Sequence, residues 1–205
     1  MIAWAGAPGR ALRLGHPATM RAVLLVGGGA AAAGLRAAMG GAVPAASLGA
    51  ATVFALVLLV LSVAAGFRVR RTPAWVRAVS LGAGGALLLV ALWLSSVPHV
   101  PVDAARHLGT LLLWTPVVAL VATGEEVMLR GALFTTLEEG AGPASALAVT
   151  SVAFALLHVP LYGWAALPLD LAAGVLLGGL RLLTGGVTAP AVAHVAADLA
   201  AGWLG

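Results

Sequence analysis

The sequence of 205 residues contains no cysteine and no lysine. Without cysteine the chain can form no disulfide, no thiolate nucleophile and no Cys-ligated metal site. Only 9% of the residues are charged, whereas a soluble domain has about 25%. The composition therefore excludes both a thiol enzyme and an ordinary soluble domain.

Apolar residues make up most of the chain. They account for 61% of the sequence, and the mean hydropathy is +1.07. The apolar runs are continuous and do not alternate with polar residues, which indicates transmembrane helices. The net charge of +4 comes from arginine. In a membrane protein such basicity reflects loop topology and contact with lipid headgroups, so we expect no nucleic-acid partner.

We predict an all-α integral membrane protein, a polytopic bundle of about seven transmembrane helices with the active site inside the bundle. The predicted spans are 23–35, 45–67, 78–97, 108–137, 144–159 (ended by Pro160), 164–180 and 187–204. The first is short, and the segment 22–40 could also be read as a signal segment. We divide the chain into an N-terminal region, 1–107, with about three spans, and a catalytic core, 108–205, with about four.

The arginines give this arrangement an orientation. With the N-terminus in the cytoplasm, eight of them fall on cytoplasmic segments: Arg10, Arg13, Arg21, Arg68, Arg70, Arg71, Arg77 and Arg181. Arg36 and Arg106 fall on outer segments, the latter in the loop 98–106. This bias follows the positive-inside rule. We predict a multi-pass protein of the cell (plasma) membrane with a cytoplasmic N-terminus.

The stretch 124–134 carries two carboxylates and a guanidinium within an apolar helix. Each charge at membrane depth costs at least about 2.5–3.5 kcal/mol. Glu126 and Arg130 are four residues apart, so on a helix they share a face and can form an ion pair. That pair alone would more often be structural than catalytic. Glu125 points to a different face and is left free for chemistry.

Four further polar side chains lie at membrane depth. They are His158, which follows Phe154 by four residues, Asp170, and the i,i+4 pair His194 and Asp198. Burial of these groups is tolerable only if they meet inside the bundle. Together with Glu125 they would make a water-activating site, with the carboxylate as base and the histidines as relay or oxyanion donors. Asp170 is expected to face a cavity or to cap a helix break.

Several classes of intramembrane protease can be excluded from the sequence. No histidine is followed by glutamate, so the His-Glu-x-x-His zinc motif is absent. Neither a Gly-x-Ser nor a Gly-x-Gly-Asp motif occurs. Two non-protease readings stay open: a transporter or proton relay that uses the buried acids, and a non-catalytic immunity or scaffold protein.

Three motifs follow one another on the apolar helices. They read Glu125-Glu126-Val-Met-Leu-Arg130, Phe154-Ala-Leu-Leu-His158 and His194-Val-Ala-Ala-Asp198, and the stretch Leu180-Arg181-Leu-Leu-Thr184-Gly185 precedes the last. In this order they resemble the CPBP (ABI) family of intramembrane proteases, which includes the type II CAAX prenyl proteases. The resemblance covers about residues 108–200.

The resemblance implies a role for each matched residue. Glu125 and His158 would activate the attacking water, and His194 and Asp198 would lie on the oxyanion side. Glu126, Arg130 and Phe154 would support the site. Asparagine is frequent at the position of Asp198, and an ionised aspartate would repel an oxyanion. Asp198 must therefore be protonated, paired with His194 or bound to another group.

The resemblance further implies a hydrolase, an intramembrane endopeptidase of the kind often classed as a metalloprotease. Its substrate would be a peptide or the C-terminal segment of a protein, lipidated or not, in contact with membrane lipid. Glu125, His158 and His194 are a legitimate set of zinc ligands. Because Arg130 already compensates one carboxylate and Asp198 can polarise His194, we expect chemistry without zinc.

Straight helices would place these residues at different depths. At about 1.5 Å per residue, Glu125 and His194 would lie in the cytoplasmic half of the membrane and His158 nearer the outer face. The three can meet only if the fifth helix begins deep in the membrane, is tilted or is broken.

Overall fold

The computed structural model describes residues 16–40, 47–69, 74–96 and 108–204. The described residues are helical and contain no strand, so the all-α class is confirmed. The elements are α1 (His16–Met39), α2 (Leu48–Ala64), α3 (Trp75–Ser96), α4 (Leu108–Glu126), the π-helix η2 (Val127–Leu133), α5 (Phe134–Tyr162), the 3₁₀ turn η3 (Trp164–Ala166), α6 (Leu167–Thr184) and α7 (Thr188–Leu204). Arg10, Arg13, Arg70, Arg71 and the loop 98–106 lie outside these residues.

The expected count of seven spans is not confirmed. Within the described residues, four helices are long and apolar enough to cross a membrane: Pro17–Met39, Trp75–Ser96, Leu112–Tyr162 and Trp164–Thr184. Two features lower the count. α2 and α7 have 17 residues each, fewer than the roughly 20 of a typical span. In addition, α4, η2 and α5 follow one another without a loop.

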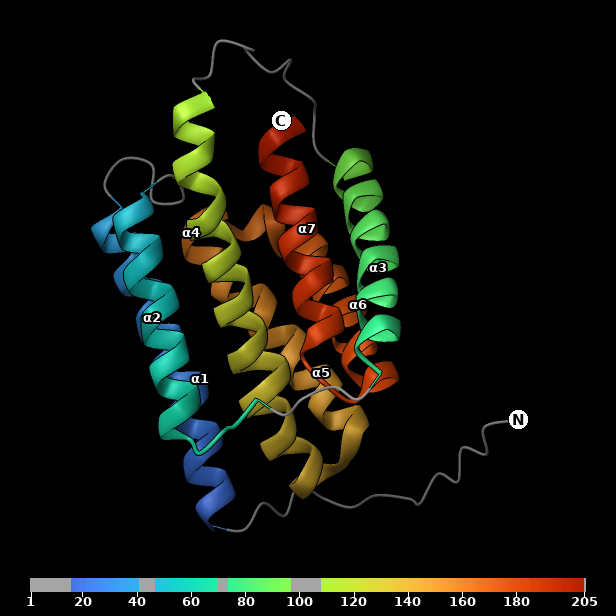
Figure 1. Cartoon of the computed structure of the whole chain (residues 1–205). Coiled ribbons are helices and arrows are strands. Elements are labelled where there is room, and N and C mark those ends of the chain that lie inside the picture. The colour runs from blue at the N-terminus through green and yellow to red at the C-terminus, as the bar shows by residue number, and fades with distance from the viewer. Residues whose placement is uncertain (1–15, 41–46, 70–73, 97–107, 205) are drawn as a thin grey trace.

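The turn between the predicted fourth and fifth spans is made by one glycine. Gly142 has φ 81° and ψ 168°, a non-helical conformation inside α5 that glycine adopts without steric cost. The chain reverses direction there (Figure 1). Glu125 precedes Gly142 by about as many residues as His158 follows it, and the two side chains therefore lie at the same depth. Pro160 does not end the helix as predicted; α5 continues to Tyr162.

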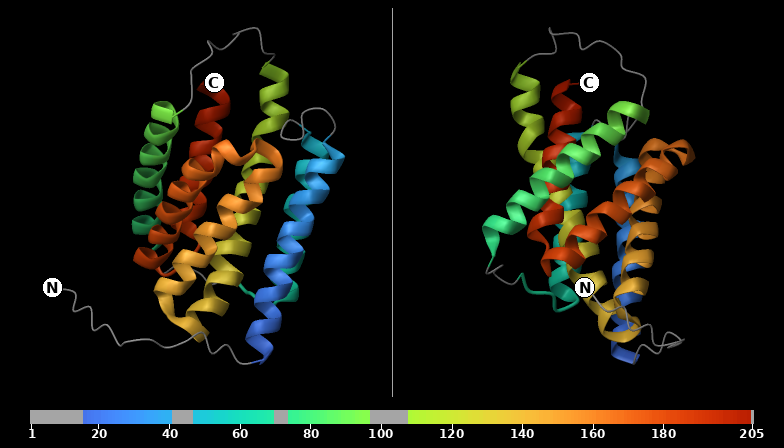
Figure 2. Two further views of the ribbon diagram at one scale, coloured as in Figure 1. Left: turned by 180° about the vertical axis from the view of Figure 1, so that it is seen from behind. Right: turned by 90° about the vertical axis from the view of Figure 1, so that its right-hand side faces the viewer.

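The helices form a bundle around a shared core. α4 and α7 cross its centre, α3 packs along α7, and α1 and α2 pack on the other side (Figure 1). α5 and α6 pack against each other behind them (Figure 2). Gly174 permits the close approach of α6 to α5, because a Cβ atom there would lie 2.9 Å from the carbonyl oxygen of Ser151. This contact is of the small-residue type common between membrane helices.

The first helix is longer than the predicted span 23–35. α1 continues to Met39 and holds Arg36 in its last turn. Its side chain is buried, and the guanidinium lies 5.2 Å from the ring centroid of Phe54 on α2. A cation at a helix C-terminus is favoured by the helix dipole, which helps to explain why the helix extends through this residue.

Candidate active site

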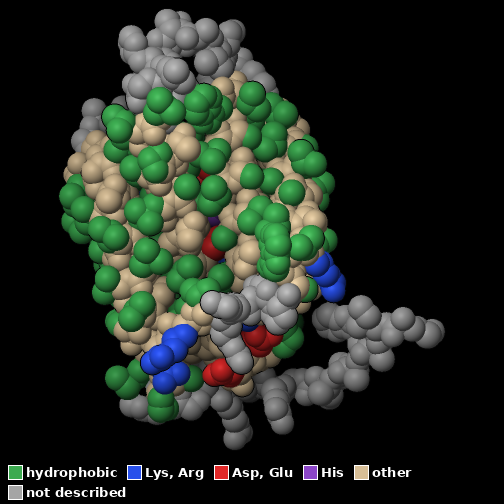
Figure 3. All heavy atoms as spheres, in the orientation of Figure 1, with side chains coloured by type: hydrophobic (Ala, Val, Ile, Leu, Met, Phe, Trp, Pro, Cys, Tyr) green, Lys and Arg blue, Asp and Glu red, His purple; other side chains and the backbone are tan. Residues whose placement is uncertain are grey.

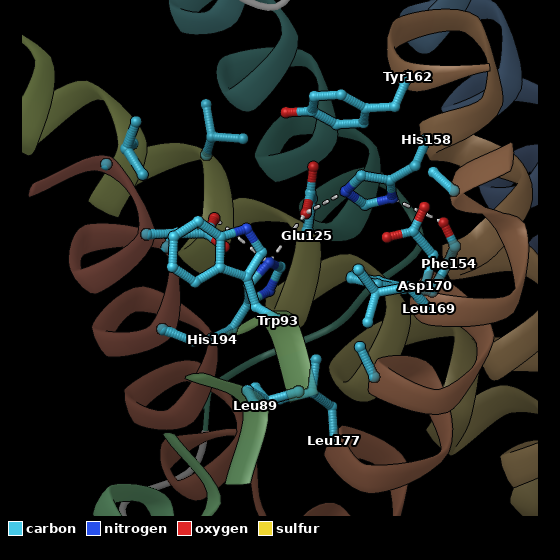
Figure 4. Close-up of a pocket in the computed structure, with 18 of the residues that line it drawn as sticks. Leu89, Trp93, Glu125, Phe154, His158, Tyr162, Leu169, Asp170, Leu177 and His194 are labelled. Atoms are coloured by element: carbon cyan, nitrogen blue, oxygen red, sulfur yellow. Dashed lines mark hydrogen bonds and ion pairs between the residues drawn. The ribbon is translucent and has the colours of Figure 1, made fainter. Parts of the chain in front are cut away.

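Glu125 lies at the centre of the group of polar side chains. It is only 2% exposed and stands at the end of α4. Its Oε2 atom is 4.0 Å from Nε2 of His158 on α5 and 3.7 Å from Nε2 of His194 on α7. Figure 4 shows the carboxylate between the two imidazoles. The structure thus brings together the three residues that the sequence placed on separate helices.

Glu126, the next residue in sequence, joins two other motif residues. Its Oε1 atom accepts from Nη1 of Arg130 at 2.9 Å and lies 2.9 Å from Nδ1 of His194. The predicted i,i+4 ion pair is therefore present, and its two side chains are fully buried. The contact with His194 was not predicted. Through this contact, Glu126 connects its ion pair with Arg130 to the ring of His194.

Arg130 is held by further contacts. Its Nη2 atom donates to the carbonyl oxygen of Gly174 at 3.0 Å, and its guanidinium lies 4.6 Å from the ring centroid of Phe154. The predicted supporting role of Phe154 agrees with this position, since the ring also contacts His158 and His194 at centroid distances of 4.5 and 5.3 Å. One aromatic ring thus contacts the cation and both imidazoles.

A π-helix follows the two glutamates directly. In η2 the backbone N–H of Phe134 reaches the carbonyl oxygen of Leu129, five residues earlier. In an α-helix that N–H would bond to the carbonyl of Arg130. The carbonyl released by the wider turn instead accepts from Nε of Arg181 at 2.9 Å. Short π-segments are frequent at functional sites, and this one orients Arg130.

The hydrogen bonds of the two histidines define their protonation. Nδ1 of His158 lies 2.8 Å from the carbonyl oxygen of Phe154, and a carbonyl can only accept. Nδ1 therefore carries the proton, and Nε2 of the neutral ring presents a lone pair toward Glu125. Nδ1 of His194 faces the carboxylate of Glu126 in the same way. Both rings consequently turn Nε2 toward the cavity.

Two aspartates line the same cavity as these residues. Oδ2 of Asp198 is 3.5 Å from Nε2 of His194, and its side chain is partly exposed. Of the three alternatives for Asp198, this geometry favours pairing with His194. Asp170 lines the same cavity in the first turn of α6, so the expectation that it faces a cavity is confirmed. Its Oδ2 atom is buried and has no hydrogen-bond partner among the described residues.

A cavity of about 610 Å³ joins these groups. Figure 3 shows acidic and histidine side chains at the bottom of a hollow in an otherwise hydrophobic flank. Two lining residues were missed by the sequence analysis. Arg36 reaches the cavity from α1, and Tyr162 stacks on His158 with a centroid distance of 5.8 Å and an interplanar angle of 15°. Tyr162 follows His158 by four residues, and that spacing could have revealed it.

The residues offered as zinc ligands do not form a metal site in this arrangement. Within the part of the chain that the structure describes, no three His, Cys, Asp or Glu side chains are placed so that they could hold one metal ion. The donor types suit zinc, but the positions of Glu125, His158 and His194 do not. We therefore derive no step through a metal.

Comparison with known proteins agrees with the motifs. Residues 107–200 match the family described as type II CAAX prenyl endopeptidase Rce1-like. No curated protein and no solved structure matches the chain. The matched segment contains all three motifs and confirms the resemblance to type II CAAX prenyl proteases. With the four apolar helices, it identifies a multi-pass integral membrane protein. Over residues 107–200 the chain is therefore similar to the Rce1-like type II CAAX prenyl endopeptidase family.

Proposed function

We propose that this protein is an intramembrane endopeptidase in which Glu125 activates a water molecule to hydrolyse a peptide bond. One observation carries the proposal: a buried carboxylate faces two Nε2 atoms, at 3.7 and 4.0 Å, in a cavity inside the bundle. The family match supports the reaction class.

The separation between Glu125 and His158 suits a bound water. A water oxygen about 2.8 Å from each of two acceptors fits beside Oε2 of Glu125 and Nε2 of His158, which are 4.0 Å apart. Both atoms accept from it, because Nε2 of the neutral imidazole carries a lone pair. Glu125 takes the proton while His158 orients the water, whose oxygen then attacks the carbonyl carbon of the scissile bond.

The attack creates a tetrahedral oxyanion, which needs a positioned donor. Nε2 of His194 supplies a donor when the ring is protonated. Two carboxylates favour that charge, Glu126 at Nδ1 and Asp198 near Nε2. When the C–N bond breaks, the proton held by Glu125 passes to the leaving amine, which regenerates the carboxylate. The products are a carboxylate and an amine.

The proposed substrate is a prenylated protein or peptide. The description of the family names a CAAX prenyl endopeptidase, and a CAAX cysteine carries its prenyl group near the C-terminus of the protein. A cavity of about 610 Å³ lies in the range of sites that enclose a small ligand, roughly 300–1,000 Å³. Most of the side chains that line it are apolar, and the proposed catalytic side chains line it as well.

The proposal includes catalysis without zinc. It rests on the arrangement of Glu125, His158 and His194, which does not suit a metal ion. Purified protein should keep its activity after dialysis against a chelator, and metal analysis should find no stoichiometric zinc in the active fraction. Activity that is lost on chelation and restored by zinc would require a different mechanism.

The central test is Glu125→Gln. Purified protein would be incubated with a peptide library and with a prenylated CAAX peptide, and cleavage followed by mass spectrometry. Glu125→Gln should lower the rate by at least about 10²–10⁴-fold, the usual contribution of a general base. His158→Ala and His194→Ala should resemble it. The matched control is Glu139→Gln, the same change at an exposed residue outside the cavity.

Melting temperatures measured on the same samples separate catalysis from folding. Glu125→Gln should stay close to wild type, since its side chain makes no hydrogen bond that holds two helices together among the described residues. Cleavage by Glu125→Gln at the wild-type rate would remove the catalytic reading. A transporter, proton relay or non-catalytic scaffold would then be the better account of the buried acids.

A further inference from the structure

Arg36 is a buried cation that the proposed reaction does not use. It stands in the last turn of α1, is 7% exposed and lines the same cavity as Glu125. It is the one arginine among the described residues that line this cavity. The family match begins at residue 107, so Arg36 belongs to none of the matched motifs.

Among the described residues, part of the hydrogen-bonding capacity of Arg36 is unused. No carboxylate among them forms an ion pair with it, and its buried Nε atom has no hydrogen-bond partner. Its contact with Phe54 does not satisfy these donors. The five N–H groups of a guanidinium need oxygen or nitrogen acceptors, and the Phe54 ring, whose centroid lies 5.2 Å from the guanidinium carbon, carries none.

Leaving a guanidinium buried without an anion is unfavourable. In a membrane protein, buried charges mark sites that bind substrates or ions. Among the described residues Arg36 therefore lacks an anionic partner, and the cavity gives such a partner access to it.

The packing of α2 on α4 connects the position of Arg36 with that of Glu125. α2 packs closely on α4 where Ala55 meets Gly124, since a Cβ atom on Gly124 would lie 3.2 Å from the carbonyl oxygen of Ala55. In the sequence, Phe54, which contacts Arg36, precedes Ala55, and Glu125 follows Gly124. Glu125 and Tyr162 line the same cavity as Arg36, yet Glu125 does not form an ion pair with it.

The remaining charges of the cavity determine where an anion can bind. Glu125, Asp170 and Asp198 also line it, and these carboxyl groups would repel a second carboxylate. Among the charged groups that line the cavity, the guanidinium of Arg36 is the one that attracts a carboxylate. A peptide cut three residues from its C-terminus carries its terminal carboxylate about 10 Å beyond the scissile bond, at about 3.3–3.6 Å per residue. A cavity of about 610 Å³ has room for such a segment.

We propose that Arg36 binds the C-terminal carboxylate of the substrate and thereby positions the scissile bond beside Glu125. This inference rests on the proposed endopeptidase function and adds a specificity determinant to it. The interaction is a charge-assisted hydrogen bond, of the bidentate kind that arginine forms with carboxylates. It makes the enzyme select peptides whose C-terminus is free.

The test compares two peptides that differ only at the C-terminus. Both carry a prenylated cysteine three residues before the end; one ends in a carboxylate and the other in a carboxamide. With wild-type protein in a non-ionic detergent, kcat/KM for the carboxamide should be about 10- to 100-fold lower, the range expected for a charge-assisted hydrogen bond. Arg36→Gln should lose the same factor on the carboxylate and little on the carboxamide.

Two further variants refine the comparison. Arg36→Lys, which keeps the charge but loses the bidentate geometry, should restore part of the preference. Arg77→Gln, at an exposed arginine of α3, should leave both rates unchanged. Equal rates on the two peptides with wild-type protein would overturn the inference, and this comparison does not depend on the folding of any variant. An equal loss on both peptides with Arg36→Gln would also overturn it and would mean that Arg36 acts through Glu125 or through the fold.

A measurement of peptide binding tests this inference independently of the proposed hydrolysis. Fluorescence anisotropy of the same two peptides with Glu125→Gln protein measures the subsite without hydrolysis. A lower Kd for the carboxylate, abolished in Glu125→Gln/Arg36→Gln, would support the subsite even if wild-type protein cleaved neither peptide. Equal Kd values would reject it even if hydrolysis were observed.

Discussion

The Oε1 atom of Glu126 lies 2.9 Å from Nδ1 of His194. The same oxygen accepts from Nη1 of Arg130 at 2.9 Å. Glu126 therefore does two things at once: it neutralises a buried guanidinium and fixes the ring of His194 so that Nε2 faces Glu125. From the sequence, Glu126 was expected only to pair with Arg130 and hold the site together.

These two roles can be separated by mutation. Glu126→Gln should destabilise the protein by about 3–5 kcal/mol, because Arg130 is left buried without its counter-ion. In Glu126→Gln/Arg130→Met both charges are gone, so most of the stability should return. Hydrolysis should stay low in both, because His194 has lost the carboxylate that orients it. Melting temperature and kcat/KM, measured on the same preparations, give the two readouts.

The double variant is the decisive one. If it folded well and hydrolysed peptides as the wild type does, Glu126 would have no part in positioning His194. Its only task would then be to compensate Arg130.

Much of the fold and part of the site follow from local sequence rules. Continuous apolar runs predicted helices close to those observed, and the spacing of Glu126 and Arg130 predicted their ion pair. The meeting of Glu125, His158 and His194 followed from a stronger constraint: polar groups on different membrane helices must find one another in the bundle interior. The equal depth of Glu125 and His158 did not follow, because it depends on the turn at Gly142.

The features that sequence reasoning missed depend on tertiary contacts. The π-helix after Glu126 leaves the carbonyl of Arg130 without its helical partner, and Nε of Arg181, distant in sequence, donates to it instead. No local pattern in the sequence 127–133 predicts this π-helix. The first span was predicted to end before Arg36, whereas α1 continues past it to Met39. A helix boundary of this kind is the least certain part of a sequence-based prediction.

Arg181 provides a test of the π-helix. Arg181→Met should lower the free energy of unfolding by about 1–3 kcal/mol, because the buried carbonyl of Arg130 loses its donor. It should also lower kcat/KM, since a shift of η2 moves Arg130 and with it Glu126. The control is Glu138→Gln. It removes only a 3.5 Å contact with Arg181 at a partly exposed carboxylate, and we expect a change within about 1 kcal/mol. Equal effects of the two variants would show that the ion pair, not the carbonyl contact, is what matters.

Two glycines of α6 form a matched pair. A Cβ atom on Gly174 would lie 2.9 Å from the carbonyl oxygen of Ser151, whereas one on Gly179 would meet nothing within 4 Å. Gly174→Ala should therefore destabilise the protein by about 1–3 kcal/mol and reduce activity, because the carbonyl of Gly174 holds Arg130. Gly179→Ala should be neutral or stabilising by up to about 1 kcal/mol, since alanine is the better helix former. Thermal unfolding of the two variants measures the difference, and the close packing of α5 on α6 would be refuted if they behaved alike.

The orientation in the membrane can be tested without altering any native thiol, because the chain contains no cysteine. Val69, after α2, and Leu204, in the last turn of α7, are both exposed. The C-terminal ends of α2 and α7 lie at opposite ends of the bundle (Figure 1). Arg68 and Arg77, at the Val69 end, are part of the arginine bias, so the positive-inside rule puts this end in the cytoplasm. In intact cells an impermeant maleimide should label Leu204→Cys and leave Val69→Cys unlabelled, and permeabilisation should expose both. Labelling of Val69→Cys from outside intact cells would reverse the orientation, and with it the side of the membrane from which the substrate reaches the cavity.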